Sequence, residues 1–163
     1  MLESPDRAMK PRLYLETTIP SYLVARSSKD LRLAADQQST QEWWENRRHE
    51  YDLFISEAVL DEAADGDPSF ADQRMKVLEG LPKLSLTPEA DVLVARLLGE
   101  RIIPSVAAPD AAYLALAAAH GMDFLLTWNC THIHNPRLER RIEAACRECG
   151  FACPVICTPA ELL

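Results

Sequence analysis

Four side chains with oxygen donors lie close to the ends of predicted strands or on helices next to them: Glu16, Glu62, Asp110 and Asn129. In a parallel sheet the carboxyl ends of the strands share one edge, where ligands usually bind. Clustered carboxylates repel one another unless a cation lies among them, and hard oxygen ligands suit Mg²⁺ or Mn²⁺. The spacing therefore suggests a metal site, although in a chain with 25 acidic residues the same positions also fit a solvated surface.

Asp110 and Asn129 belong to a stretch that joins a predicted buried helix to a predicted buried strand. Ala107 to His120 are nearly all apolar, with many alanines, and Gly121 stands where such a helix stops. Asp110 therefore falls in the first turns of that helix. The apolar run from Phe124 to Trp128 is typical of a central parallel strand, and its carboxyl end delivers Asn129 to a loop.

Glu16 stands at a predicted junction between a strand and a helix. Arg12 to Leu15 alternates as a short strand that ends at Glu16. Thr17 or Thr18 can cap the helix that follows, and Pro20 suits its first turn.

Glu62 lies on a helix that Ser56 can cap, together with two other acids that also suit a solvated face. Residues 27–50 fit one long helix or two, with Trp43 and Trp44 in the core. The other predicted elements are strands over 53–55, 83–86 and 154–157 and helices over 57–64, 68–79, 88–99 and 136–149.

Strands alternate with helices along the whole chain, without a two-residue hairpin signature. This pattern predicts an α/β protein with a central parallel sheet and helices on both faces, a three-layer α/β/α fold. A length of 163 residues with 48% hydrophobic residues suits one domain. We expect a flexible N-terminal tail over 1–11 and a single domain over 12–163.

Composition also limits the compartment and the partners. The chain has no apolar run long enough to cross a membrane and its first residues lack the apolar core of a signal peptide, so we expect a soluble, cytoplasmic protein with no membrane association. Five cysteines leave one unpaired in any disulfide scheme, which favours reduced thiols. A net charge of −8 disfavours non-specific coating of nucleic acid, but a local basic patch and bound metal ions are compatible with a nucleic-acid enzyme.

Three further groups are weaker candidates for chemistry, and each has an ordinary structural interpretation. The four C-terminal cysteines suit either a zinc site or buried thiols. The loop histidines suit contact with phosphate or a plain polar loop, and the arginines suit a phosphate patch or helix solubility. These residues are Cys146, Cys149, Cys153, Cys157, His132, His134, Arg137, Arg140 and Arg141.

Three segments resemble the motifs of PIN-domain nucleases, in the order of that family. They are YLETT, a strand that ends in an acid followed by Thr; FISEAVLDEAADGD, with an acid at Glu62; and PDAAYLALAAAHGMDFLLTWN, which begins an Ala-rich helix with Asp110 and ends in Thr-x-Asn. The similarity spans roughly residues 12–132. It is greatest to the VapC-like toxins of bacterial toxin–antitoxin pairs.

The resemblance implies a PIN-like fold and a metal-dependent endoribonuclease. Glu16, Glu62 and Asp110 would hold Mg²⁺ or Mn²⁺, Asn129 would complete the site, and Thr127 would orient a metal-bound water or a carboxylate. The expected partners are an RNA substrate, a small antitoxin protein and a second copy of the chain in a homodimer.

Two positions depart from the family pattern. Glu16 stands where the family generally has Asp, and the added methylene moves the carboxylate by about 1.5 Å, which disturbs the octahedral geometry that Mg²⁺ demands. Asn129 stands where Asp is also found, which lowers the charge of the site. The alternative function is a catalytically weak or inactive PIN module that serves as a partner-binding or oligomerisation domain.

Overall fold

The structure is a computed structural model that describes residues 9–163. The predicted tail lies outside this range except for residues 9–11, which belong to no helix or strand. Five parallel strands form one sheet in the order β3-β2-β1-β4-β5. They are β1 (Arg12–Leu15), β2 (Asp52–Ser56), β3 (Lys83–Leu84), β4 (Phe124–Leu126) and β5 (Val155–Cys157).

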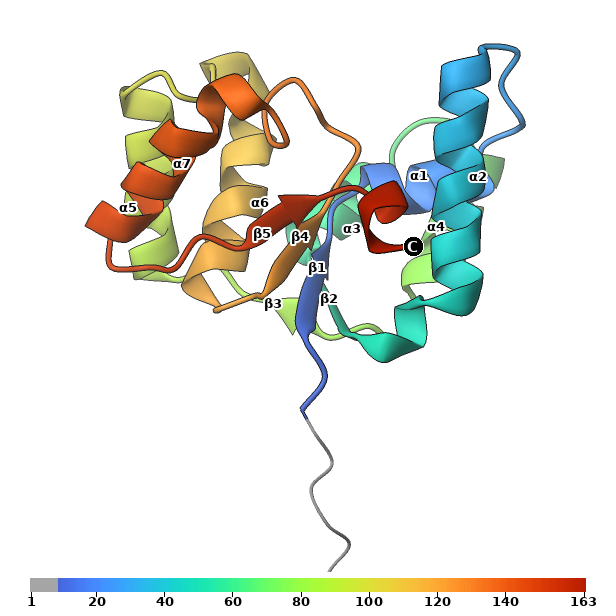
Figure 1. Ribbon diagram of the computed structural model, residues 1–163, viewed down its shortest axis with the longest axis horizontal. Coiled ribbons are helices and arrows are strands. Elements are labelled where there is room, and N and C mark those ends of the chain that lie inside the picture. Colours follow the sequence, from blue (N-terminus) through green and yellow to red (C-terminus); the bar gives the residue numbers. More distant parts are fainter. Residues whose placement is uncertain (1–8) are drawn as a thin grey trace, which may run out of the picture.

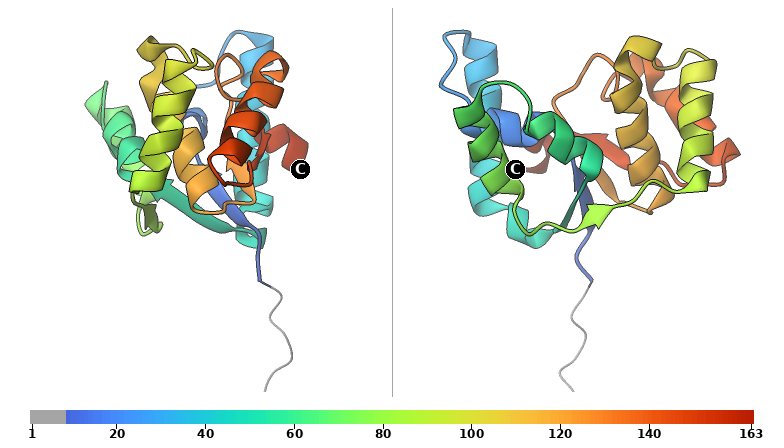
Figure 2. Two further views of the ribbon diagram at one scale, coloured as in Figure 1. Left: turned by 90° about the vertical axis from the view of Figure 1, so that its left-hand side faces the viewer. Right: turned by 180° about the vertical axis from the view of Figure 1, so that it is seen from behind.

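Helices cover both faces of the sheet, so the three-layer α/β/α prediction is confirmed (Figures 1 and 2). One layer packs α5 against α6 and α7, and the other packs α1 against α2 and α4. Short α3 follows β2 and contacts both α4 and α6. The helices are α1 (Thr18–Val24), α2 (Leu31–Asn46), α3 (Glu57–Ala63), α4 (Pro68–Leu78), α5 (Pro88–Gly99), α6 (Ala108–Ala119) and α7 (Pro136–Glu148), with 3₁₀ turns η1 (Arg48–Glu50), η2 (Ser105–Ala107) and η3 (Pro159–Leu162).

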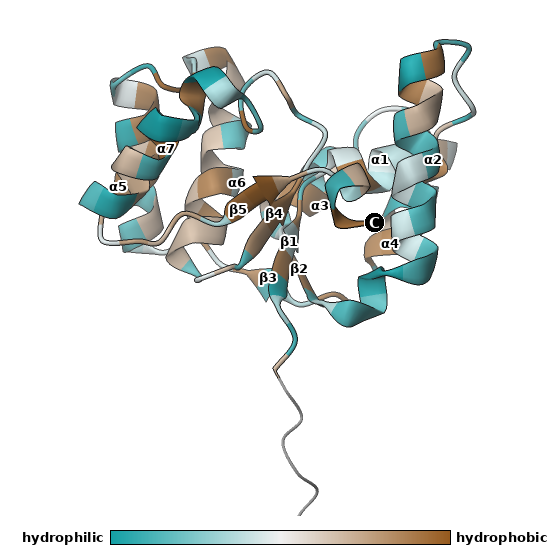
Figure 3. Ribbon diagram, viewed as in Figure 1, coloured by the Kyte–Doolittle hydropathy of each residue, from teal (hydrophilic) through white to brown (hydrophobic). Residues whose placement is uncertain are grey.

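The core is one cluster of buried residues to which β1 and α6 contribute heavily. Leu13, Tyr14 and Leu15 are fully buried, because β1 is the central strand and is covered on both faces. Seven of the twelve residues of α6 are buried as well, which agrees with its Ala-rich sequence. In Figure 3 the strands are largely hydrophobic, whereas α2 and α7 carry many hydrophilic residues.

Most predicted boundaries hold, and the differences have local causes. Residues 27–50 contain one α-helix, α2, which begins where Asp30 accepts hydrogen bonds from Arg32 N and Leu33 N and is followed by the 3₁₀ turn η1. Trp43 is fully buried, as predicted. The strand predicted over 83–86 ends at Leu84, and β4 ends at Leu126 because the N–H of Trp128 turns away to donate to Thr18 Oγ1.

No helix within residues 9–163 combines the length and the apolar composition that are needed to cross a membrane.

Candidate functional site

The strand order creates a switch point between β1 and β4. From β1, the chain proceeds to β2 and β3 on one side of the sheet and to β4 and β5 on the other. Open α/β sheets bind ligands beyond the carboxyl ends of the strands at such a point. Glu16 follows β1 directly and Thr127 follows β4 directly, so two of the predicted site residues lie there.

Glu16 is almost completely buried, with 2% of its surface exposed. Its Oε2 accepts hydrogen bonds from Thr18 N at 3.1 Å, Thr18 Oγ1 at 2.5 Å and Thr127 Oγ1 at 2.9 Å. Burial raises the pKa of this carboxyl to about 7; the three hydrogen bonds oppose the rise, and the nearby charge of Glu62 adds to it. Glu16 therefore ties the end of β1 to the end of β4 and to the start of α1.

The start of α1 differs from the prediction that Thr17 or Thr18 caps it. Thr17 occupies the N-cap position, but its side chain makes no capping hydrogen bond. The carboxylate of Glu16 takes that role instead, because it accepts from the N–H of Thr18. The hydroxyl of Thr17 is thereby left to bind other site residues.

Glu62 projects from α3 and is exposed, unlike Glu16. Its Oε2 accepts hydrogen bonds from Thr17 Oγ1 at 3.3 Å and from Tyr113 OH. The hydroxyls of Thr17 and Tyr113 are themselves 3.2 Å apart. Burial raises the pKa of Tyr113, and its bond to Glu62 raises it further, so the phenol stays a proton donor at neutral pH. This triad fixes α3 against α1 and α6.

Asp110 lies half-buried in the first turn of α6. Burial raises its pKa, the nearby side chains of Asn129 and His132 lower it, and the charge of Glu62 raises it. Glu62 thus interacts electrostatically with both Glu16 and Asp110. The three acids come from three separate segments of the chain.

Asn129 lies in the loop after β4, and its side chain lowers the pKa of Asp110. Its Oδ1 accepts from the backbone N–H groups of Thr131 at 3.3 Å and His132 at 3.0 Å. The amide oxygen is therefore engaged within its own loop. Thr127 Oγ1 accepts from Asn129 N at 2.9 Å while it donates to Glu16, which links the two residues.

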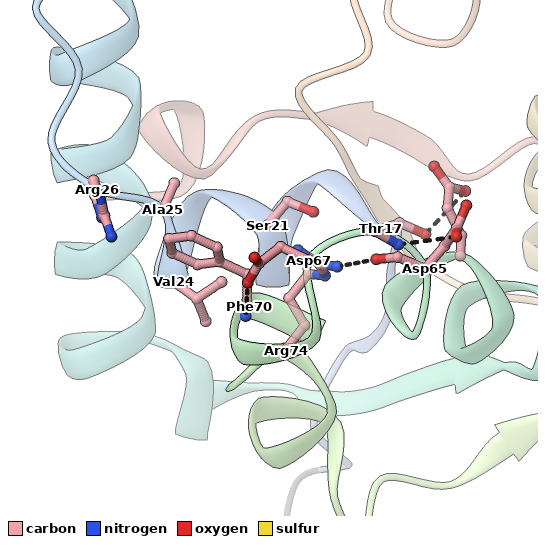
Figure 4. A pocket seen from close by; sticks show the side chains of 11 residues that line it. Thr17, Ser21, Val24, Ala25, Arg26, Asp65, Asp67, Phe70 and Arg74 are labelled. Carbon is pink, nitrogen blue, oxygen red and sulfur yellow. Dashed lines mark hydrogen bonds between the residues drawn. The ribbon is translucent and has the colours of Figure 1, made fainter. Parts of the chain in front are cut away.

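Two hollows meet at Glu62. One, of about 620 Å³, is lined by Glu62, Asp110 and Tyr113 together with His132. The other, of about 770 Å³, runs from Thr17 and Glu62 between α1 and α4 (Figure 4). The acids consequently stand beside space that is large enough for a ligand in the size range of about 300–1,000 Å³ typical of small-molecule sites.

The donor set suits a hard divalent cation, since the acidic groups offer only oxygen. In both Glu16 and Glu62 every hydrogen bond from the described residues goes to Oε2, which leaves Oε1 available. Carboxylates that bind a metal are commonly held in this way by a second group. As the side chains lie, residues 9–163 contain no group of three or more His, Cys, Asp or Glu residues that could share one ion.

Thr17, Thr18 and Tyr113 are the site residues that sequence reasoning missed. Tyr113 has a signal in retrospect, because it is the one polar aromatic residue in an Ala-rich helix and lies three positions after Asp110, on the same face. The threonines stood beside Glu16 but were assigned to helix capping.

The weaker candidates lie apart from the acids, except His132. His134 Nε2 lies 2.9 Å from Glu161 Oε1, which is also the acid of a capping box with Thr158. All five cysteines are free. Arg141 donates to the carbonyl of Glu100.

A comparison with protein-family models and a comparison with curated proteins found no match for this chain.

Proposed function

We propose that the protein is a metal-dependent endoribonuclease that hydrolyses RNA phosphodiester bonds with Mg²⁺ or Mn²⁺. The observations that carry the proposal are that Glu16 follows the carboxyl end of β1, that hydroxyl groups hold Oε2 of both Glu16 and Glu62, and that Asp110 lines the same hollow as Glu62. The resemblance of three segments to the PIN-domain motifs supports the same conclusion.

Each side chain then has a defined task. Glu16, Glu62 and Asp110 would hold the ion with Asn129 completing the site, and Thr127 and Tyr113 fix the two glutamates. When bound, a divalent ion would lower the pKa of a water molecule that it holds and would neutralise the charge that develops on the phosphate. The chain itself needs no side-chain nucleophile, so its role is to position the carboxylates and to bind the substrate.

The resemblance to VapC-like toxins extends the proposal to the biological partners. We infer a small antitoxin protein that inserts a peptide with a basic side chain beside the acids, since opposite charges favour such an interface. We also infer a homodimer and a cytoplasmic location. The mass of the purified protein by light scattering tests the dimer directly.

Incubation of the purified protein with a mixed pool of single-stranded and structured RNA tests the activity. We expect cleavage with Mg²⁺ or Mn²⁺, none in excess chelator, and none for Glu62→Gln. Glu57→Gln is the matched control, because Glu57 lies on the same helix and pairs with Lys83 at 2.7 Å, an exposed pair of small energetic value. Undiminished cleavage in chelator would exclude the metal mechanism.

One observation favours the alternative function, a PIN module without catalysis. Glu16 is buried, and a carboxyl with a pKa of about 7 is partly protonated at neutral pH, which weakens it as a ligand. Isothermal titration with Mn²⁺ separates the two functions. Absence of binding, or binding without cleavage of any RNA, would favour a role in partner binding or oligomerisation.

A further inference from the structure

The pocket of about 770 Å³ between α1 and α4 carries groups that the proposed chemistry does not use. It begins at Thr17 and Glu62 and extends to Arg26, and Figure 4 shows Phe70 and Arg74 between these ends. The pocket therefore adjoins the acids at one end and presents positive charge at the other. A polymer that places one group at the acids would continue into it.

Arg26 and Phe70 lie next to each other in this pocket. The guanidinium carbon of Arg26 lies 5.7 Å from the centre of the Phe70 ring, within the range of a cation–π interaction. Phe70 is half-buried and Arg26 is exposed, so the ring is held while the guanidinium is accessible. Aromatic rings and guanidinium planes are the surfaces on which unpaired bases stack.

Both guanidinium groups of the pocket keep their charge uncompensated by any ion pair within residues 9–163. Arg74 donates to the backbone carbonyls of Ala63 and Asp65, which fixes its position without neutralising it. Asp67 also lines the pocket, but its carboxylate caps α4 by accepting from Ser69 N and Phe70 N. Glu62 and Asp65 also line the pocket, so Arg26, at the end away from Glu62, is the cation that lies farthest from the acids in Figure 4.

We propose that this pocket binds the nucleotide next to the scissile phosphate in single-stranded RNA. The base stacks on the surface formed by Phe70 and Arg26, and Arg26 contacts a backbone phosphate. This inference rests on the proposed function, because it takes RNA as the substrate whose phosphate lies at Glu62. It also predicts a preference for unpaired RNA, since a base in a duplex cannot reach the ring.

The test is fluorescence anisotropy with a labelled short oligouridylate in chelator at low salt, where no cleavage occurs. We expect Phe70→Leu to weaken binding by about 5- to 100-fold, the range found for loss of one base–aromatic stack. Arg26→Gln should weaken binding and reduce the slope of log K against log salt by about 1. Arg32→Gln, an exposed arginine outside the pocket, should change affinity by less than about twofold.

A second ligand separates stacking from charge. An abasic ribose-phosphate oligomer of the same length should bind wild type and Phe70→Leu equally, while Arg26→Gln still weakens it. Because Phe70 is half-buried, thermal melting checks that its variant folds, and the exposed Arg26 gives a result that does not depend on that check.

Three outcomes would overturn the inference: wild type that does not bind the oligouridylate, variants at Phe70 and Arg26 that bind like wild type, or an acidic peptide that binds as tightly with the same dependence on Phe70. The last result would assign the pocket to a protein partner. The nuclease proposal fails separately. If RNA binding depends on Phe70 but no metal-dependent cleavage occurs, the pocket assignment stands and the nuclease proposal is refuted. If wild type cleaves RNA but Phe70→Leu binds RNA as tightly as wild type, only the pocket assignment is refuted.

Discussion

Asp110 is the residue at which stability and function should separate. Its charge is disfavoured by burial and by Glu62, so Asp110→Asn should leave the metal-free fold equally or more stable. The same change removes a metal ligand. Mg²⁺ that binds only the folded protein stabilises it by about 2.7 kcal/mol at roughly a hundredfold excess over its dissociation constant. Wild type should therefore melt at a higher temperature with Mg²⁺, and the variant should not.

Thermal melts of both proteins in chelator and in excess Mg²⁺ measure this difference, with RNA cleavage as a second readout. A variant that is markedly destabilised in chelator would show that Asp110 serves the start of α6 instead of the metal site.

Glu16 should make the stability of the metal-free protein depend on pH. Its folded pKa of about 7 lies above the ordinary value of 4.5, so the folded state holds a proton that the unfolded state has released between these values. The favourable contribution of Glu16 is complete below pH 4.5 and is lost as the pH rises toward 7. Glu16→Gln keeps an oxygen acceptor but cannot ionise. As the pH rises between these two values, its free energy of unfolding should increase relative to that of wild type by on the order of 1–3 kcal/mol.

Urea unfolding in chelator across this pH range measures the difference between the two proteins. A constant difference would mean that Glu16 has the same pKa in the folded and the unfolded chain.

At the scale of elements, α3 matters because it carries Glu62 to the sheet edge. Ser56 Oγ caps this helix by accepting from Val59 N at 3.3 Å, and it lies 2.7 Å from the buried hydroxyl of Tyr14. Ser56→Ala should destabilise the fold by about 1–3 kcal/mol, since the cap is lost and Tyr14 loses its partner. It should also lower RNA cleavage several-fold, because α3 positions Glu62.

Thr87→Ala is the control for this prediction. Thr87 caps α5 in the same way, through Ala90 N at 3.1 Å, but α5 carries none of the site residues. The control should lose about 1 kcal/mol of unfolding free energy and retain full cleavage at a temperature where both variants are folded. Equal RNA cleavage by the two variants would show that the cap at the start of α3 does not position Glu62.

At the scale of the whole molecule, the acidic site and the net charge of −8 favour a basic partner. Co-expression with the proposed antitoxin should give a stable complex, and the complex should cleave RNA more slowly than the free protein. Size-exclusion chromatography and the cleavage assay measure both effects. If the protein is harmless to cells when expressed alone and no partner copurifies, the toxin assignment should be abandoned.

The sequence by itself determined the features that depend on residues close together in the chain. The starts of α3 and α5 were predicted correctly, because Ser56 and Thr87 bind N–H groups only three residues away. The α/β class follows from the same local patterns, since alternation of strands and helices restricts how their apolar faces are buried. The sequence also indicated that Glu16 follows β1 and that Asp110 starts α6, which are local facts.

Only the tertiary structure decided how these residues meet. Thr127 binds Glu16 across 111 positions of the chain, and Tyr113 binds Glu62 across 51, so no pattern within a single element encodes either contact. The direction of the Asn129 amide, the burial of Glu16 and the pocket between α1 and α4 depend on strand order and on helix packing over the sheet. Local propensities act over a few residues, whereas side-chain orientation in a site is set by groups that only the folded chain brings within hydrogen-bonding distance.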